Sequence, residues 1–388
     1  MGESTTAQGV QTRRREWDLP LPVVLSAVIM AATARLALMP YISEDSTYFL
    51  IPWMQEFREH GAAALSGEFS NYNFPYLFLM FLAGLLPVEP LIAIKVASLL
   101  GDGLLAVSVY ALAANYRTIG VSPKLAALIA LFLPTVLVNA SMWGQCDAIY
   151  TAFLVLSLRS LLRNDGRSAW LLWGVAFAFK LQSVFFLPAL LLISLRNRYT
   201  LTFPLMAFGV WAMLSLPPVF FGRSLASTFS VYINQTQEYR LVAGAANIYA
   251  WFPTATAEQG RIPALVVCGT ALLLTAAAYW RGPDTTERRV LFTITVLAVC
   301  PLLLPQMHDR YFFAAEVMAL LLLRHKKLFL TPWLLATTGV FVYILYFVSN
   351  QYALPLMLGS VVQCLTVWLL FRALWRRHNW APGTESDY

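Results

Sequence analysis

Charged residues are scarce in this sequence. Only 12% of its 388 residues are Asp, Glu, Lys or Arg, whereas 59% are hydrophobic. A soluble domain carries about 25% charged residues, so this composition excludes an ordinary soluble protein. The net charge of +7 is then better explained by membrane topology than by binding to nucleic acid.

Cysteine and histidine are also rare, with four of each in the chain. No cysteine stands in a CxxC motif or at a spacing typical of Cys/His metal sites. All four cysteines fall in or beside apolar runs, so we expect buried free thiols. The sequence offers no clear ligand set for a metal, and we expect none.

Long apolar runs are abundant, by contrast. Residues 19–39, 203–221, 328–347 and 354–370 each have roughly the 17–25 residues needed to cross a bilayer core. The first run follows a polar, Arg-rich head and lacks a small-residue cleavage site, so we expect a retained span rather than a signal peptide. The sequence therefore predicts an all-α polytopic membrane protein with one domain over residues 1–388.

Basic clusters give the topology, because they favour the cytoplasmic side of a membrane. They lie near residues 13–15, 117–124, 159–167, 196–198, 281–289, 324–327 and 372–377. Placing all of them inside requires about twelve crossings. The expected crossings are near 18–40, 91–113, 122–140, 146–161, 200–221, 262–280, 289–305, 311–323, 328–348 and 353–371, with two short helices between 167 and 196.

This topology has two cytoplasmic ends, residues 1–17 and 373–388, and two long outer loops, residues 41–87 and 222–261. The same topology places the unusual polar residues together at the outer face, although the placement of the basic clusters does not require this. They are Glu44, Asp45, Asn71, Asn73, Gln145, Asp147, Lys180, Gln182, His308, Asp309 and Arg310. We therefore expect one outward-facing polar site.

The first outer loop contains the stretch SEDSTYFLIPW. Ser43 is suited to cap a helix that starts at Glu44, because acidic residues are favoured in a first turn. Phe49, Leu50, Trp53 and Phe57 form an apolar stripe, which predicts an interfacial amphipathic helix. The helix either anchors the loop at the surface or holds a carboxylate where a lipid-linked head group would lie. A shorter apolar segment, 74–86, is expected to lie along or dip into the outer interface.

Three further stretches carry the remaining candidates. Asp147 lies between two expected spans, either in a simple polar turn or in a site. Lys180 has apolar residues on both sides, which favours a polar cavity or an anionic ligand. His308 and Arg310 lie in a short loop and suit phosphate oxygens, although a plain interface loop is the alternative.

Two other groups of polar residues are weaker candidates. Lys95 and Asp102 lie two turns apart on one expected helix face and are more easily explained as structural partners of each other or of Arg35. The loop 222–261 mixes aromatic residues with amides, which suits sugar binding but also suits any membrane interface.

Taken in order, the stretches SEDSTYFLIPW, FSNYNFPYLFL, IKVASLLGD, MWGQCDAIYTAF, AFAFKLQSVFFLPALLL, ANIYAWFP and PQMHDRYFF resemble a known family. They are similar to bacterial relatives of the GPI-anchor second mannosyltransferase, in the GT-C superfamily. The resemblance runs from the first span to about residue 315. The elements WGQxD, FKxQ and MHxRY carry it together, whereas each alone is weak. One departure is NFPY, in which Phe74 replaces the first of two prolines that related sequences usually have.

The resemblance implies a GT-C-like bundle that moves a hexose, with mannose suggested by the family name, from a polyprenyl-phosphate donor. The transfer would invert the anomeric carbon and use a glycan or glycolipid acceptor. It would take place on the outer face of a bacterial inner membrane, without a cofactor. Asp45 falls at the position of the general base, with Glu44 as its neighbouring competitor.

The other roles follow the chemistry of the expected reaction. His308, Arg310 and Lys180 would bind the donor phosphate, because a departing phosphate needs positive charge. Glu44, Gln145, Asp147, Gln182, Trp143 and Asn73 would bind or position the substrates.

A secondary transporter or flippase is the main alternative for a bundle with polar residues inside. It predicts charges near the bilayer midplane and two similar halves. The sequence shows neither of these features, and a purely structural scaffold would not need so many polar groups at one level.

Overall fold

The computed structural model describes residues 19–115, 122–235, 241, 243–252, 257–323, 325, 327–336 and 353–376. These residues are helical almost throughout, and the part described contains no β-strand. The α-helices are α1 (Leu21–Leu38), α2 (Ile51–His60), α3 (Phe74–Gly84), α4 (Pro90–Asn115), α5 (Pro123–Phe132), α6 (Pro134–Val138), α7 (Asp147–Leu162), α8 (Gly166–Phe179), α9 (Leu187–Arg196), α10 (Thr202–Ser215), α11 (Leu225–Gln235), α12 (Ala257–Trp280), α13 (Thr286–Leu303), α14 (Phe313–Ala319) and α16 (Ala353–Trp375).

Short helical segments connect several of these helices. Two are π-helical, η2 (Ser46–Leu50) and η5 (Asn139–Trp143). The 3-10 segments are η3 (Gly61–Ser66), η6 (Leu181–Phe186), η7 (Pro217–Phe221), η8 (Ile248–Trp251), η9 (Asp309–Phe312) and η10 (Leu320–Leu322).

Five described helices are long and apolar enough to cross a membrane: Leu21–Leu38, Pro90–Asn115, Thr202–Phe221, Gln259–Trp280 and Pro355–Trp375. A sixth is possible if α5 and the segment Pro134–Trp143 form one bent span. The chain is therefore a helical membrane protein, as composition predicts. The expected number of about twelve crossings is not confirmed, because only five or six described segments meet these criteria. The two short helices expected between 167 and 196 are present as α8 and α9, with 14 and 10 residues. Residues 337–348 of one expected span lie outside the described residues, as do the head 1–17 and residues 377–388 of the tail.

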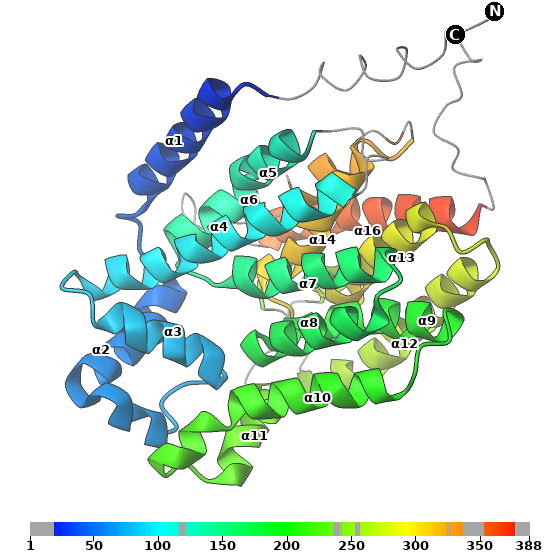
Figure 1. Cartoon of the computed structure of the whole chain (residues 1–388). Coiled ribbons are helices and arrows are strands. Elements are labelled where there is room, and N and C mark those ends of the chain that lie inside the picture. Colours follow the sequence, from blue (N-terminus) through cyan, green and yellow to red (C-terminus); the bar gives the residue numbers. More distant parts are fainter. Residues whose placement is uncertain are drawn as a thin grey trace, which may run out of the picture.

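The helices α4, α7, α8 and α10 lie side by side, and α2, α3 and α11 lie at one end of them (Figure 1). The helix α13 is buried at every position between Arg288 and Leu302. It contacts α9, α12, α14 and α16. Because α13 is fixed on several sides, its C-terminal end is a firm support for the loop that follows it.

The apolar stripe of the first outer loop packs against protein. The helix begins at Glu44, and the Ser43 hydroxyl accepts a hydrogen bond from the Ser46 amide at 3.1 Å, so the predicted cap is confirmed. Leu50, Trp53 and Phe57 are buried against α3 and α4. These three side chains therefore do not anchor the loop in lipid, because the two neighbouring helices cover them.

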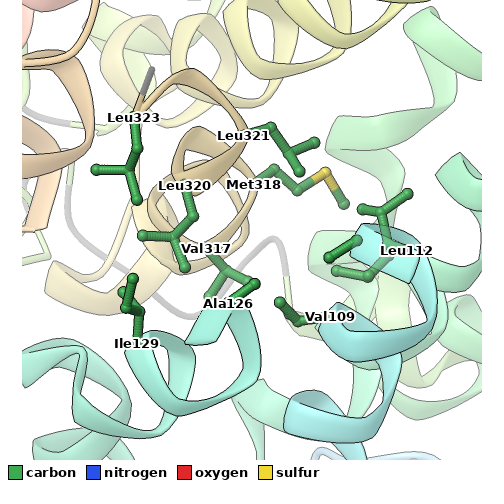
Figure 2. Close-up of a pocket in the computed structure, with 11 residues that line it drawn as sticks. Val109, Leu112, Ala126, Ile129, Val317, Met318, Leu320, Leu321 and Leu323 are labelled. Atoms are coloured by element: carbon green, nitrogen blue, oxygen red, sulfur yellow. The ribbon is translucent and has the colours of Figure 1, made fainter. Parts of the chain in front are cut away.

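A small apolar pocket lies between α4, α5 and the segment formed by α14 and η10. Figure 2 shows aliphatic side chains of these elements, among them Val109, Ile129 and Leu320, around a common space. No titratable side chain lines this pocket. Its lining supports packing and offers no group for acid, base or ion chemistry.

Arg289 connects three turns through hydrogen bonds at the end of the bundle that carries the predicted cytoplasmic basic clusters. The guanidinium of Arg289 donates to Asp284, to Asn164 and to Asn197 at 2.7–2.9 Å. These partners come from the turns after α7, α9 and α12. The three turns therefore lie at the same end of the bundle, as the placement of the basic clusters predicts. The side of the membrane on which that end lies stays a prediction.

A buried ion pair supports the bend between α5 and α6. The two helices meet at 53° where Pro134 begins the second helix, because proline cannot continue the hydrogen-bond ladder. Arg35 donates to the Leu131 carbonyl at 3.0 Å and pairs with Asp102 at 2.8 Å. Lys95 donates instead to the carbonyls of Met39 and Tyr41, so all three side chains bind other parts of the protein.

We predict that Asp102→Asn destabilises the protein by on the order of 3 kcal/mol, because the buried Arg35 loses its counter-charge. Unfolding in increasing SDS measures the loss. The double variant Arg35→Met with Asp102→Leu should recover most of it, since no charge then remains buried. Equal losses in the single and double variants would contradict this account.

Candidate active site

Polar residues from four separate segments meet at the end of the bundle near α2 and α3. Asp45 precedes η2, and Gln145 and Asp147 lie where η5 joins α7. Lys180 lies between α8 and η6, and Arg310 lies in η9. The sequence predicted that these residues share one level, and the structure brings them into direct contact.

Backbone contacts hold the turn that contains WGQCD. Gly144 has a φ of +73°, the left-handed region that glycine adopts most easily. The hydroxyls of Ser43 and Ser46 donate to the Trp143 carbonyl at 3.0 and 3.1 Å, and Ser98 donates to the Gly144 carbonyl at 3.0 Å. The turn is thus joined to the first outer loop and to α4, which fixes the direction of the side chains on either side of Gly144.

The Asp45 carboxylate has one anchored oxygen and one open oxygen. Its Oδ2 accepts hydrogen bonds from Trp143 Nε1 at 3.1 Å and Gln145 Nε2 at 2.7 Å, and it pairs with Arg310 at 3.0 Å. Its Oδ1 makes no hydrogen bond or ion pair with the described residues. The side chain is 19% exposed. Oδ1 is therefore available to a ligand while Oδ2 holds the group in place.

Asp147 and Lys180 form a buried ion pair beside Asp45. The Lys180 ammonium lies 2.7 Å from Asp147 Oδ1, and the two side chains are 4% and 0% exposed. Asn139 donates to Asp147 Oδ2 at 2.8 Å. The ammonium also lies over the rings of Tyr72 and Tyr150. Of the two alternatives for Lys180, the polar cavity is the one observed. Its counter-charge is the Asp147 carboxylate of the protein itself.

A break in the helix places Lys180 in this pair. Its backbone is extended, with φ −154° and ψ 135°, and this ends α8. The break leaves the carbonyls of Phe177 and Ala178 without helical partners, and both accept a hydrogen bond from the Tyr232 hydroxyl on α11. Tyr232 of α11 therefore stabilises the break at Lys180 that the site requires.

Arg310 lies among three carboxylates. Its guanidinium is 3.0 Å from Asp45, 3.8 Å from Asp147 and 3.5 Å from Asp309. Its Nε is buried and makes no hydrogen bond with the described residues. Arg310 is 8% exposed. The side chain is thus the common partner of every carboxylate at this point of the site.

The loop before Arg310 is held by the segment 241–245. The Gln306 amide donates to the Leu241 carbonyl at 2.9 Å, and the Ala245 amide donates to the Met307 carbonyl at 3.1 Å. The backbone of His308 forms bridges with residues 243 and 244. This pairing fixes the chain where Gln306 adopts a positive φ of +62°.

Asn247 and Tyr249 close the C-terminal end of α13. Asn247 donates to the carbonyls of Pro301 and Leu304, and the Tyr249 hydroxyl donates to the Leu303 carbonyl at 2.8 Å. Both side chains are buried. The sugar-binding interpretation of the amides and aromatics in this loop is wrong for these two, because they satisfy carbonyls at the helix end. Gln237, Tyr239 and Arg240 of the same loop lie outside the described residues.

The environment changes the protonation of two residues next to Arg310. Burial, only partly offset by Arg310, raises the pKa of Asp309 to about 7. Burial together with the Arg310 and Lys180 cations holds the pKa of His308 well below its usual value. At neutral pH His308 is therefore uncharged, and it can offer a phosphate a hydrogen bond but no positive charge.

The contacts surround a pocket with an empty volume of about 400 Å³, which includes its open mouth. Six predicted residues line it: Asp45, Asn71, Gln145, Lys180, Gln182 and Arg310. The Gln182 Oε1 atom is buried and has no hydrogen-bond partner among the described residues. A ligand that donates a hydrogen bond therefore meets a prepared acceptor here.

Other predicted residues lie outside the pocket wall. Asp147 and Trp143 support its lining from behind, and Glu44 is exposed. Asn73 is buried and donates to Ser215 at 3.1 Å, which joins the start of α3 to α10. The wall also contains residues that the sequence did not single out as site candidates: Phe49, Leu50, Trp53, Tyr72, Gln235 and Tyr311. Tyr72 could have been noticed from its position between two asparagines.

The described residues hold no group of three or more His, Cys, Asp or Glu side chains suited to a metal ion. Cys146, Cys268 and Cys300 are buried free thiols, as predicted, whereas Cys364 is an exposed free thiol on α16. Comparison of the sequence with protein-family models finds no match, and comparison with curated proteins finds none either.

We predict that Asp309 makes the protein less stable as the pH rises. An unfolded aspartate has a pKa of about 3.9, and burial raises the folded value to about 7. The folded state binds the extra proton between these values, so stability is present below about pH 4 and falls by at most about 1.4 kcal/mol per pH unit up to pH 7. Asp309→Asn should flatten this part of a stability profile measured by SDS unfolding, and a profile with the wild-type slope would refute the assignment.

Proposed function

We propose that the protein is an inverting glycosyltransferase of the GT-C type, which takes a hexose from a polyprenyl-phosphate donor. The observation that carries the proposal is the arrangement of Asp45 and Arg310 at the wall of one pocket. A carboxylate with one free oxygen lies 3.0 Å from a guanidinium. A displacement at a lipid-linked sugar needs this combination, because one group must accept a proton and another must stabilise a phosphate.

In the proposed reaction, Asp45 Oδ1 accepts the proton from an acceptor hydroxyl while the hydroxyl oxygen attacks the anomeric carbon. The bond between that carbon and the phosphate oxygen breaks, and its electron pair leaves with the polyprenyl phosphate. A single displacement inverts the anomeric carbon. Arg310 stabilises the charge on the departing phosphate, for which a preorganised cation contributes on the order of 3 kcal/mol.

The remaining residues have supporting roles in this scheme. Trp143 and Gln145 orient the base through Asp45 Oδ2. Gln182 accepts a hydrogen bond from a sugar hydroxyl, for which its buried Oε1 atom is suited. The Lys180 ammonium is already neutralised by Asp147, so we assign it a supporting role and give the phosphate to Arg310. His308 is not part of the pocket lining, so we assign it no direct contact with the phosphate.

The identity of the substrates rests on the family resemblance. It favours a mannosyl donor, a glycan or glycolipid acceptor, and a site that faces the exterior of a bacterial inner membrane. The apolar helices are compatible with a lipid-linked donor, because the donor's chain must remain in the bilayer while its head group reaches the pocket.

Reconstitution in lipid vesicles distinguishes this enzyme from a transporter or flippase. An enzyme forms a new glycosidic bond from a polyprenyl-phosphate hexose and an acceptor extracted from the native membrane, which mass spectrometry detects. Movement of the lipid-linked substrate across the vesicle membrane without any bond change would support the transporter and refute the proposal.

We predict that Asp45→Asn lowers the rate of transfer by about a hundredfold or more, because a positioned general base contributes roughly 10²–10⁴-fold. Asparagine keeps the shape and the acceptor oxygen, so the fold should be retained. Glu44→Gln should keep most of the activity, because Glu44 is exposed and does not line the pocket. The opposite pattern in a single-turnover assay would assign the base to Glu44.

A further inference from the structure

The site has no surplus positive charge in the protein alone. Lys180 is neutralised by Asp147, and Arg310 is neutralised by Asp45, with Asp309 as a third carboxylate beside it. His308 adds no positive charge, because its pKa is lowered. A phosphodiester brings a further negative charge, so it can bind well only if one of these cations changes its partner.

The two ion pairs differ in how easily they can separate. Release of Lys180 would leave Asp147, which has no exposed surface, with an uncompensated charge in the protein interior. Release of Arg310 would leave Asp45 partly exposed to water and still bound by Trp143 and Gln145. The separation of Arg310 from Asp45 is therefore far less costly.

Arg310 also has the means to bind a phosphate. Guanidinium groups bind phosphate oxygens through two parallel N–H donors. The Nε atom of Arg310 makes no hydrogen bond with the described residues and faces Asp147 Oδ2 only at 3.8 Å, so this donor is weakly engaged in the protein alone. The Asp309 carboxylate accepts a hydrogen bond from the Arg310 amide at 3.0 Å, which fixes the backbone from which the side chain extends.

We propose that Arg310 holds Asp45 until the donor arrives and then transfers to the lipid-linked phosphate, which releases Asp45 to act as the base. The inference rests on the proposed function and adds an order of events to it. Because a carboxylate paired with a guanidinium is a weaker base than the same carboxylate without that partner, the acceptor is activated only after the donor is bound. The phosphate and Asp45 are thus competitors for one cation.

Competition between Asp45 and the phosphate for Arg310 predicts a change in phosphate affinity that a simple binding role for Arg310 does not predict. Asp45→Asn removes the competing charge, so the inactive variant should bind a polyprenyl monophosphate about three- to tenfold more tightly than the wild type. The full chain is placed in lipid nanodiscs, and the dissociation constant is measured by microscale thermophoresis. Polyprenol without phosphate measures the contribution of the lipid chain.

Three further variants make the test specific. Glu89→Gln removes one exposed negative charge at the start of α4 and should leave the affinity unchanged. Arg310→Gln should weaken binding by about tenfold or more. Asp45→Ala removes the same charge as Asp45→Asn and provides the measurement if the asparagine variant does not fold.

The outcomes separate the inference from the function on which it rests. Tighter binding by both Asp45 variants, with no change in Glu89→Gln, supports the exchange of Arg310. An unchanged or weaker affinity in the Asp45 variants, while Arg310→Gln still loses affinity, overturns the exchange and leaves the donor site. A wild-type protein that binds polyprenol as tightly as the phosphate overturns the lipid-phosphate donor itself.

Discussion

The architecture of the site depends on the burial of one carboxylate, that of Asp147. A fully buried carboxylate is stable only with a counter-charge and hydrogen bonds, because the protein interior replaces little of its hydration. Lys180 and Asn139 supply these at 2.7 and 2.8 Å. To meet this demand α8 must end at Phe179, and the chain must turn Lys180 inward. The break in the bundle and the charged wall of the pocket are therefore consequences of the same ion pair.

The irregular segments of the chain gather around this pair. Two π-helical segments, η2 and η5, and the 3-10 segments η6 and η9 carry or adjoin the polar residues. Regular helices would place their side chains on the cylinder surface and leave the backbone no freedom to redirect them. The long second outer loop compensates for the lost helical bonds, since Asn247 and Tyr232 bind carbonyls at two helix ends. Rigidity at the site is thus achieved by loops that bind helix ends.

Much of this arrangement could be predicted from the sequence, because its signals are local. The lengths of the apolar runs predicted the helices. The placement of the basic clusters predicted that Asp45, Asp147 and Lys180 lie at the same end of the bundle. The partners within that level could not be predicted, since they depend on helix packing between distant segments. The position of Arg310 between two carboxylates is of this kind, and so is the burial of Trp53 beneath α3. The number of crossings is not confirmed, because α8 and α9 end near the site and are shorter than a typical membrane-spanning helix.

Asp45 and Asp147 have the same chemistry, and their surroundings favour different roles. Asp147 has no exposed surface, and both its oxygens lie against Lys180, Asn139 or Arg310, so no substrate proton can reach it without unpairing a buried charge. Asp45 lines the pocket and binds its protein donors through one oxygen only, Oδ2. A group that must exchange a proton needs such an accessible lone pair, whereas a group that positions a cation needs permanent partners. This contrast in environment, rather than the carboxylate itself, is the reason to assign the proton transfer to Asp45.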